Sequence, residues 1–309
     1  MKSSYVSWQP VRERPWPERN TTRLWSPDGK RKFPRHIFIP DWQACTGVLG
    51  DHIAAIGVYC AYKKPDVIVL AGDMGDFPSC SYWDKRKWTF GERSYGKDCA
   101  ALEHALQLFL APIIEESERT GWIPLIIVTL GNHEDRVDRC LMDIDGGKWR
   151  DAVELPAAIY ERYGIEVFEF LNPVMIDGIA YCHYFPNPMT GKPQTGMMQT
   201  MLKNVGFSFS MGHRQLLDMG NRTLANGQKQ RGLIAGACYL HNEDYRPGPS
   251  NLHWRGIIMK NEVDGYGDYS IMDINLQYLL REHGHTVEGV RLGQPDPSWD
   301  GCEIWSPLK

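Results

Sequence analysis

This sequence of 309 residues lacks several features that would assign it directly to a class of protein. No apolar run approaches the roughly 20 residues that a membrane span requires, so we expect no membrane partner. The first 17 residues contain no apolar core, and we do not expect a secretory signal peptide. The eight cysteines are scattered without a C-x-x-C pair, which argues against a zinc ribbon and favours reduced thiols in a cytoplasmic protein. The net charge is only −4, so any affinity for nucleic acid must come from a local patch.

From residue 35 onward the sequence contains an alternation of predicted strands and helices. Strands are expected at residues 36–39, 66–70, 124–130, 165–170, 179–182 and 207–211, with a hairpin turn at Asp177-Gly178. Helices are expected at residues 51–62, 98–119, 148–163 and 197–204. The remainder is β-rich at residues 232–240, 256–260 and 269–275, and a short helix follows at 276–282. The pattern predicts an α/β protein in which two mixed β-sheets pack as a sandwich flanked by helices.

The two ends of the chain differ from this middle part. Residues 1–35 mix proline, tryptophan and basic side chains and predict an irregular arm. Its tryptophans either dock on the domain surface or contact a partner or nucleic acid. We therefore expect an arm at 1–35, one domain at 36–282 and a tail at 283–309. No nucleotide-binding glycine pattern occurs in any of the three parts.

Five short motifs within this alternation are rich in metal-binding side chains. Each follows a predicted strand, and in chain order they are Asp41-Trp42-Gln43, Gly72-Asp73, Gly131-Asn132-His133-Glu134, His183 and Gly212-His213-Arg214-Gln215. In open α/β sheets, ligands bind at the carboxyl ends of the strands. Two Asp, an Asn and two or three His gathered at such an edge are most simply explained as the two-metal centre of a hydrolase.

The five motifs resemble those of the calcineurin-like metallophosphoesterases, which read D-x-H, G-D, G-N-H-[DE], H and G-H-x-H. The resemblance covers about residues 36–280 and implies the same sandwich fold. A single Gly-Asp pair is uninformative, whereas five motifs in order, each after a strand, are a specific signal. Two positions depart from the family pattern, because Gln43 and Gln215 stand where the family usually has His.

The resemblance implies two divalent metal ions that share one carboxylate. The ligands implied for the first ion are Asp41, Gln43, Asp73 and Gln215. The ligands implied for the second ion are Asp73, Asn132, His183 and His213. Asp73 is the bridge in this arrangement, because two ions about 3.5–4 Å apart need a shared ligand.

The two glutamines change the expected metal preference. An amide oxygen is a neutral, weaker donor than an imidazole nitrogen, so the first site becomes an all-oxygen site. Oxygen ligands favour Mn²⁺ or Mg²⁺, whereas imidazole suits Zn²⁺ or iron. We expect Mn²⁺, easily lost from the first site, with Mg²⁺, Fe²⁺ or Zn²⁺ as the other candidates. A degenerate site that binds one ion or is inactive is the alternative interpretation.

The resemblance also implies residues that act on the substrate. His133 is expected to face the substrate as general acid or transition-state stabiliser, with Glu134 or a neighbouring carboxylate orienting its ring. Arg136 either binds a phosphate group of the substrate or simply pairs with nearby acids.

A basic and aromatic stretch follows the second motif at residues 81–93. It includes Lys85, Arg86, Lys87 and Trp88. Cations that bind phosphate and rings that stack on bases are the two components of single-stranded nucleic-acid binding. The stretch is therefore either a substrate-binding segment above the metal centre or an ordinary surface insertion.

Together these features predict an enzyme that hydrolyses a phosphoester through a metal-bridging hydroxide. The expected substrate is a phosphodiester of nucleic acid or a nucleotide. The chain is similar to the DNA-repair-exonuclease-like members that bacteriophages often encode, and such an origin would place it in the host cytoplasm. The alternatives are a phosphomonoesterase for nucleotides or phosphoproteins, and a non-catalytic nucleic-acid-binding protein with a degenerate metal site.

Overall fold

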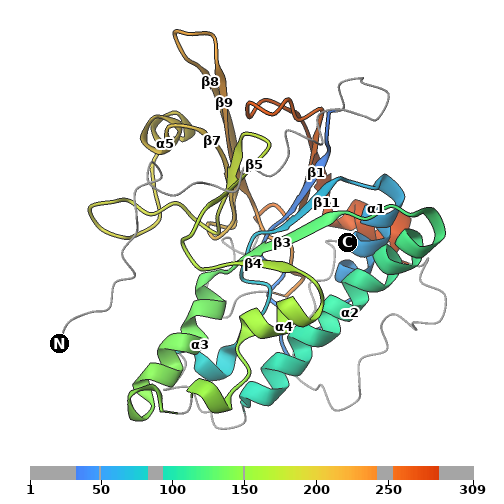
Figure 1. Ribbon diagram of the computed structural model, residues 1–309, viewed down its shortest axis with the longest axis vertical. Helices are drawn as coiled ribbons and strands as arrows, with labels where there is room; N and C mark the ends of the chain where they lie inside the picture. The colour runs from blue at the N-terminus through green and yellow to red at the C-terminus, as the bar shows by residue number, and fades with distance from the viewer. Residues whose placement is uncertain (1–32, 49, 83–92, 149, 242–252, 285–309) are drawn as a thin grey trace.

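The computed structural model describes residues 33–48, 50–82, 93–148, 150–241 and 253–284. In these residues two mixed β-sheets are flanked by six α-helices (Figure 1). The α/β sandwich predicted from the sequence is confirmed.

The larger sheet has six strands in the order β11-β10-β1-β2-β3-β4. Their bounds are β1 (His36–Ile39), β2 (Val67–Leu70), β3 (Leu125–Thr129), β4 (Glu166–Phe168), β10 (Gly256–Asn261) and β11 (Ser270–Asn275). β1 to β4 are parallel, and β10 and β11 extend the sheet in antiparallel pairing. β2 is a continuous apolar run, and β1 is apolar after His36. Both strands are buried along their whole length, as expected for strands covered on both faces.

The smaller sheet has five strands in the order β5-β6-β7-β9-β8. Their bounds are β5 (Val174–Ile176), β6 (Ile179–Tyr181), β7 (Ser208–Met211), β8 (Leu217–Thr223) and β9 (Lys229–Ala235). The expected hairpin joins β5 to β6, and both Asp177 and Gly178 have the positive φ of a tight two-residue turn. The strand pattern did not predict β8, because Gly220 and Asn221 in its centre have low strand propensity.

The helices and sheets form four layers with an apolar core between each neighbouring pair. The helices are α1 (Asp51–Lys63), α2 (Tyr95–Thr120), α3 (Asn132–Asp143), α4 (Pro156–Arg162), α5 (Met198–Val205) and α6 (Leu276–His283). All of them except α5 pack on the outer face of the larger sheet, and α5 covers the outer face of the smaller one (Figure 1). The inner faces of the two sheets meet in a third core that includes Phe38, Val69, Tyr181 and Leu233.

One predicted helix is wrong in its extent and one helix was missed. The helix expected at residues 148–163 is only α4, which begins at Pro156. A proline disfavours helical geometry in the residue before it and fits the first turn itself, and Leu155 is accordingly extended. α3 was not predicted because its first turn is polar and only Glu134, Val137 and Leu141 are buried along it.

Several expectations concern residues outside the described part of the chain. These are most of the N-terminal arm, the basic stretch with Lys85, Arg86, Lys87 and Trp88, and all but the first two residues of the C-terminal tail. The division at residues 35 and 283 stays a prediction. Among the described residues, no helix combines the length and the apolar character that crossing a bilayer would require.

A buried lysine lies between the two sheets. Lys260 on β10 is fully buried, and its Nζ donates to Tyr181 Oη at 3.2 Å and to Ser210 Oγ. The Nζ also lies 4.3 to 5.2 Å from the ring centroids of Phe38, Tyr181 and Tyr269. Burial lowers the pKa of Lys260 well below its usual value, because the charged form loses its hydration.

We expect Lys260→Met to flatten the pH dependence of stability between pH 7 and 10. A lysine whose pKa is lowered by folding destabilises the native state wherever the unfolded chain still binds the proton. The unfolding free energy of the wild type should therefore increase as the pH rises through this range. The increase is about 1.4 kcal/mol for each pH unit by which folding lowers the pKa of Lys260. Urea unfolding at each pH measures the difference, with exposed Lys203→Met as the control. An equal gain in unfolding free energy in Lys260→Met would contradict the lowered pKa of Lys260.

Candidate metal centre

Three glycines let the motif loops approach one another. Gly72 has a φ of 87°, which turns the chain sharply after β2. A Cβ on Gly131 would lie 2.1 Å from Asp73 Oδ1, and a Cβ on Gly212 would lie 2.4 Å from Asp41 Oδ1. Any larger residue at these positions would therefore displace the two carboxylates from the edge of the sheets.

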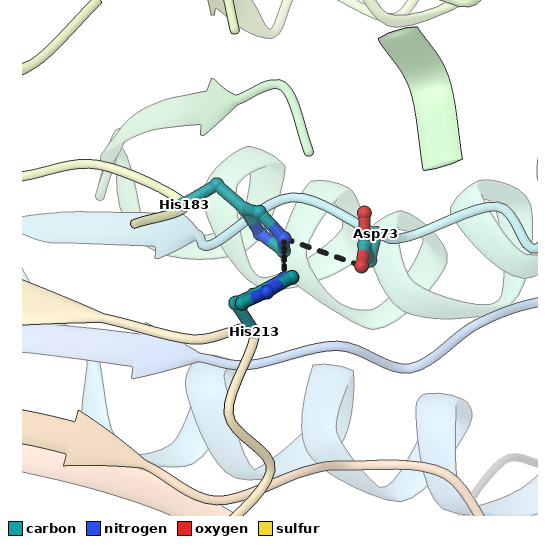
Figure 2. A group of neighbouring side chains, drawn as sticks. All are labelled: Asp73, His183 and His213. Atoms are coloured by element: carbon teal, nitrogen blue, oxygen red, sulfur yellow. Dashed lines mark hydrogen bonds and ion pairs between the residues drawn. The ribbon is translucent and has the colours of Figure 1, made fainter. Parts of the chain in front are cut away.

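Four predicted metal ligands converge at this edge. Asn132 Oδ1 lies 3.0 Å from His183 Nε2 and 2.8 Å from His213 Nδ1. His183 Nε2 lies 3.2 Å from Asp73 Oδ2 and 3.2 Å from His213 Nδ1. Figure 2 shows Asp73, His183 and His213 directed toward one another, and a ligand atom from each lies within 4.8 Å of the others. The four residues implied for the second ion thus lie together, two after strands of the larger sheet and two after strands of the smaller one.

The ring of His183 has the orientation of a metal ligand. Its Nδ1 donates to the carbonyl of Ala71 at 2.8 Å, so Nε2 is directed toward Asp73. A hydrogen bond of this kind on the far nitrogen commonly fixes the tautomer of a metal-binding histidine. The ring is fully buried, which restricts it to this position.

Burial and the charges within the cluster shift the pKa values of its members in different directions. Burial alone would lower the pKa of His183, but the adjacent Asp73 carboxylate outweighs burial and raises that pKa to about 9. Burial would raise the pKa of Asp73, but the positive charges of His133 and His183 hold it below its usual range. Burial, together with the charge of His183, lowers the pKa of His213 to about 4. A divalent cation here would take the place of bound protons.

The residues implied for the first ion are buried beside this cluster. Asp41 Oδ1 accepts from the amide of His213 at 3.3 Å, whereas its buried Oδ2 has no hydrogen-bond partner among the described residues. Burial raises the pKa of Asp41 to about 7. Both amide atoms of Gln43 are likewise buried without a partner in the described structure. Gln215 Oε1 accepts from Tyr239 Oη at 2.9 Å. A carbonyl oxygen of this kind can accept a second interaction.

These residues fit a pair of divalent cations. The unpaired Oδ2 of Asp41 and the unpaired amide of Gln43 each cost about 1–3 kcal/mol of stability. A bound cation would offset this cost. The second-ion cluster offers two imidazole nitrogens and two oxygens, and the first-ion residues offer oxygens alone. The donor set therefore suits a transition metal at one position and a hard, oxygen-preferring ion at the other.

Asp76, which the sequence did not single out, contacts the ring of His133. His133 Nδ1 lies 2.9 Å from Asp76 Oδ1, and its Nε2 lies 3.7 Å from Asp73 Oδ2. Burial lowers the pKa of His133, but the carboxylates of Asp73 and Asp76 outweigh burial and raise it. Arg136 donates to the carbonyl of Asp76 at 3.1 Å, so it pairs locally at the same loop. The sequence contained a signal for this contact, because Asp76 is a second carboxylate three residues after Asp73.

Glu134, which the sequence offered as a catalytic residue or a partner of His133, instead binds the backbone of the motif loops. Its carboxylate is buried and accepts five hydrogen bonds. The donors are the amides of Asp73, Met74, Gly75 and Gly131 and the hydroxyl of Tyr160. The carboxylate that orients His133 is therefore the neighbouring one, Asp76.

Comparisons with known proteins agree with part of this picture. Residues 34–186, just under half of the chain, match the family model described as calcineurin-like phosphoesterase. No curated protein matches the sequence. One matching crystal structure aligns with 79% of this chain and 99% of its own at 12% identity, and its TM-score of 0.29 is too low to support an argument.

Glu134→Ala should unfold the motif loops rather than slow one chemical step. It removes the acceptor of four backbone amides, and each buried donor left unpaired costs about 1–3 kcal/mol. We expect a loss of about 3 kcal/mol or more of unfolding free energy together with weaker Mn²⁺ binding, measured by urea unfolding and calorimetry. The exposed Glu161→Ala serves as the control. Normal stability and metal content with lost turnover would instead return Glu134 to a catalytic role.

Proposed function

We propose that the protein is a metal-dependent phosphoesterase that hydrolyses a phosphodiester of a nucleic acid or nucleotide. The observation that supports this most directly is the meeting of Asp73, Asn132, His183 and His213 at one edge of the sheets. These side chains are far apart in the sequence, and a purely structural role would not require four metal-binding groups to face one another. The calcineurin-like phosphoesterase domain supports the class of reaction.

The proposed centre holds two divalent ions. Asp41, Gln43, Asp73 and Gln215 would bind the first. Asp73, Asn132, His183 and His213 would bind the second. Bound there, the ions neutralise the phosphoryl oxygens and supply a nucleophile at neutral pH. Because the first ion would have only oxygen ligands, we propose Mn²⁺ as the native ion, with looser binding at the first position.

His133 is proposed as the proton donor to the leaving oxygen. Asp76 holds its Nδ1, so Nε2 faces the side of Asp73, where the phosphoester would lie. Burial lowers the pKa of His133, but the two neighbouring carboxylates outweigh it and raise that pKa, which favours the protonated imidazole that a proton donor needs. Arg136 would support Asp76 rather than bind phosphate, because its guanidinium already donates to the carbonyl of that residue.

The diester preference rests on the sequence of residues 81–93. Lys85, Arg86, Lys87 and Trp88 combine the charge and the ring surface that a nucleic-acid strand would need. A phosphomonoesterase would use the same metal ligands, so only a comparison of monoester and diester substrates distinguishes the two functions.

Purified protein with Mn²⁺ should hydrolyse bis(p-nitrophenyl) phosphate faster than p-nitrophenyl phosphate. Asp73→Asn should abolish this activity and lower the metal content, because the shared carboxylate is lost. Release of nitrophenol and elemental analysis measure the two effects. A preference for the monoester would favour the phosphomonoesterase, and no turnover with Mn²⁺, Mg²⁺, Fe²⁺ or Zn²⁺ would favour a degenerate site.

His133→Ala should behave differently from a ligand variant. We expect unchanged metal content and turnover slowed by about 10²–10⁴, the usual contribution of general acid–base assistance. His213→Ala is the matched comparison, since it removes an imidazole from the same site and should lower the metal content. If metal content fell equally in both variants, His133 would have to be reassigned as a ligand.

A further inference from the structure

Four buried polar side chains meet between the two sheets, inside a core that is otherwise apolar. His36 and Lys260 are directly paired residues of the neighbouring strands β1 and β10 in the larger sheet. Tyr181 and Ser210 are directly paired residues of the neighbouring strands β6 and β7 in the smaller sheet. All four are fully buried among the apolar residues that join the sheets. Each sheet thus contributes one pair of polar side chains to the same place.

Hydrogen bonds connect these two pairs across the space between the sheets. Tyr181 Oη lies 2.7 Å from His36 Nδ1 and accepts from Lys260 Nζ at 3.2 Å. Lys260 Nζ also donates to Ser210 Oγ. The other ring nitrogen of His36 lies 2.9 Å from Asp177 Oδ2, in the turn between β5 and β6. Two strands of the larger sheet are therefore bonded to two strands of the smaller sheet.

These bonds lie just before the candidate ligands in the chain. Tyr181 stands two residues before His183, and Ser210 stands three residues before His213. On the other side of the network, β1 pairs along its whole length with β2, which leads into Asp73. The network therefore ties the two histidine-bearing strands to the sheet that carries the proposed bridging carboxylate.

Directional bonds restrict the sheets in a way that apolar packing does not. Apolar packing holds the sheets at a fixed distance, but the attraction between apolar groups has no preferred direction along the sheet. A hydrogen bond weakens steeply away from its preferred distance and angle, and a buried polar group that loses its partner is costly. Sliding one sheet over the other would break the bonds of the network. A metal site is equally demanding, because its ligands have to lie within about 0.2 Å of their ideal distances.

We propose that Lys260 is a positioning residue for the metal centre. It fixes the lateral position of one sheet over the other, and so the placement of the two candidate histidine ligands relative to Asp73. Lys260 acts through Tyr181 and Ser210, because its own side chain is enclosed between the sheets. This role rests on the proposed function, since it requires that ions bind at the cluster.

Lys260→Met tests the role, because it removes the donors and keeps the apolar stem. Both hydroxyls keep a hydrogen bond, Tyr181 with His36 and Ser210 with Tyr269. Replacing a buried cationic group by an apolar one of similar volume is often neutral or stabilising, so the unfolding free energy of the metal-free protein should stay equal or rise. The dissociation constant for Mn²⁺ should nevertheless rise about tenfold, the lower end of what supporting residues contribute to metal affinity. Urea unfolding and calorimetry on the full-length protein measure the two effects.

Val263→Ala is the matched control. Val263 is fully buried in the same core between the sheets, and its truncation leaves a cavity without removing a bond of the network. This variant should lose unfolding free energy and keep the Mn²⁺ affinity of the wild type. Substitution with Co²⁺ adds a spectroscopic signature, because its visible absorption depends on ligand geometry. The bands should change in Lys260→Met and stay unchanged in Val263→Ala.

Tyr181→Phe tests whether Lys260 acts through the hydroxyl of Tyr181. The single variant should also weaken Mn²⁺ binding. The double variant Lys260→Met with Tyr181→Phe should bind Mn²⁺ about as weakly as the weaker single variant, because both changes remove the same bond. Fully additive effects on Mn²⁺ affinity would contradict this route.

The outcomes separate this role from the proposed hydrolysis. The role is overturned if Lys260→Met binds Mn²⁺ as the wild type does, or if metal affinity simply follows the unfolding free energy in Lys260→Met and Val263→Ala. A wild type that binds neither Mn²⁺ nor Co²⁺ would overturn the metal centre and this role together. A wild type that binds both ions and shows the Lys260 effect, but hydrolyses no phosphoester, would support the role and contradict only the proposed hydrolysis.

Discussion

The geometry of the metal centre depends on one buried carboxylate, that of Glu134. It accepts from the amides of Asp73 and Gly131 at 2.9 Å each, and so joins the loop after β2 to the start of α3. Asp73 has a φ of 53°, an unfavourable conformation for a residue with a side chain, and needs such support. The hydrogen bonds that position Asp73, the proposed bridging ligand, are therefore made by backbone amides and by Glu134. Neither is proposed to act on the substrate.

The centre also depends on how the two sheets pack. Asp73 and Asn132 follow strands of the larger sheet, while His183 and His213 follow strands of the smaller sheet. The apolar core between the sheets sets the separation of these two pairs, because close-packed interiors resist small shifts. The amide of Gly212 donates to the carbonyl of His183, which links the two histidine-bearing loops directly.

The two glutamines distinguish the position proposed for the first ion from that proposed for the second. Gln43 and Gln215 carry no charge, so the first-ion position has Asp41 and Asp73 as its only carboxylates. Trp42, between Asp41 and Gln43, is fully buried, and its ring packs edge-on against Phe109 of α2 at 5.4 Å between the centroids. One short segment therefore contributes both to the proposed chemistry and to the packing of α2.

The sequence by itself determined the strands, the order of the motifs and the metal-binding residue types, because buried apolar runs and the polar groups that follow them are local signals. It did not reveal α3 or β8, whose apolar pattern is weak. The contacts of Glu134 and Asp76 were decided only by the tertiary structure. The sequence shows that a residue carries a carboxylate, but it does not show whether that carboxylate contacts an ion, an imidazole or backbone amides. The tertiary structure determines the partner.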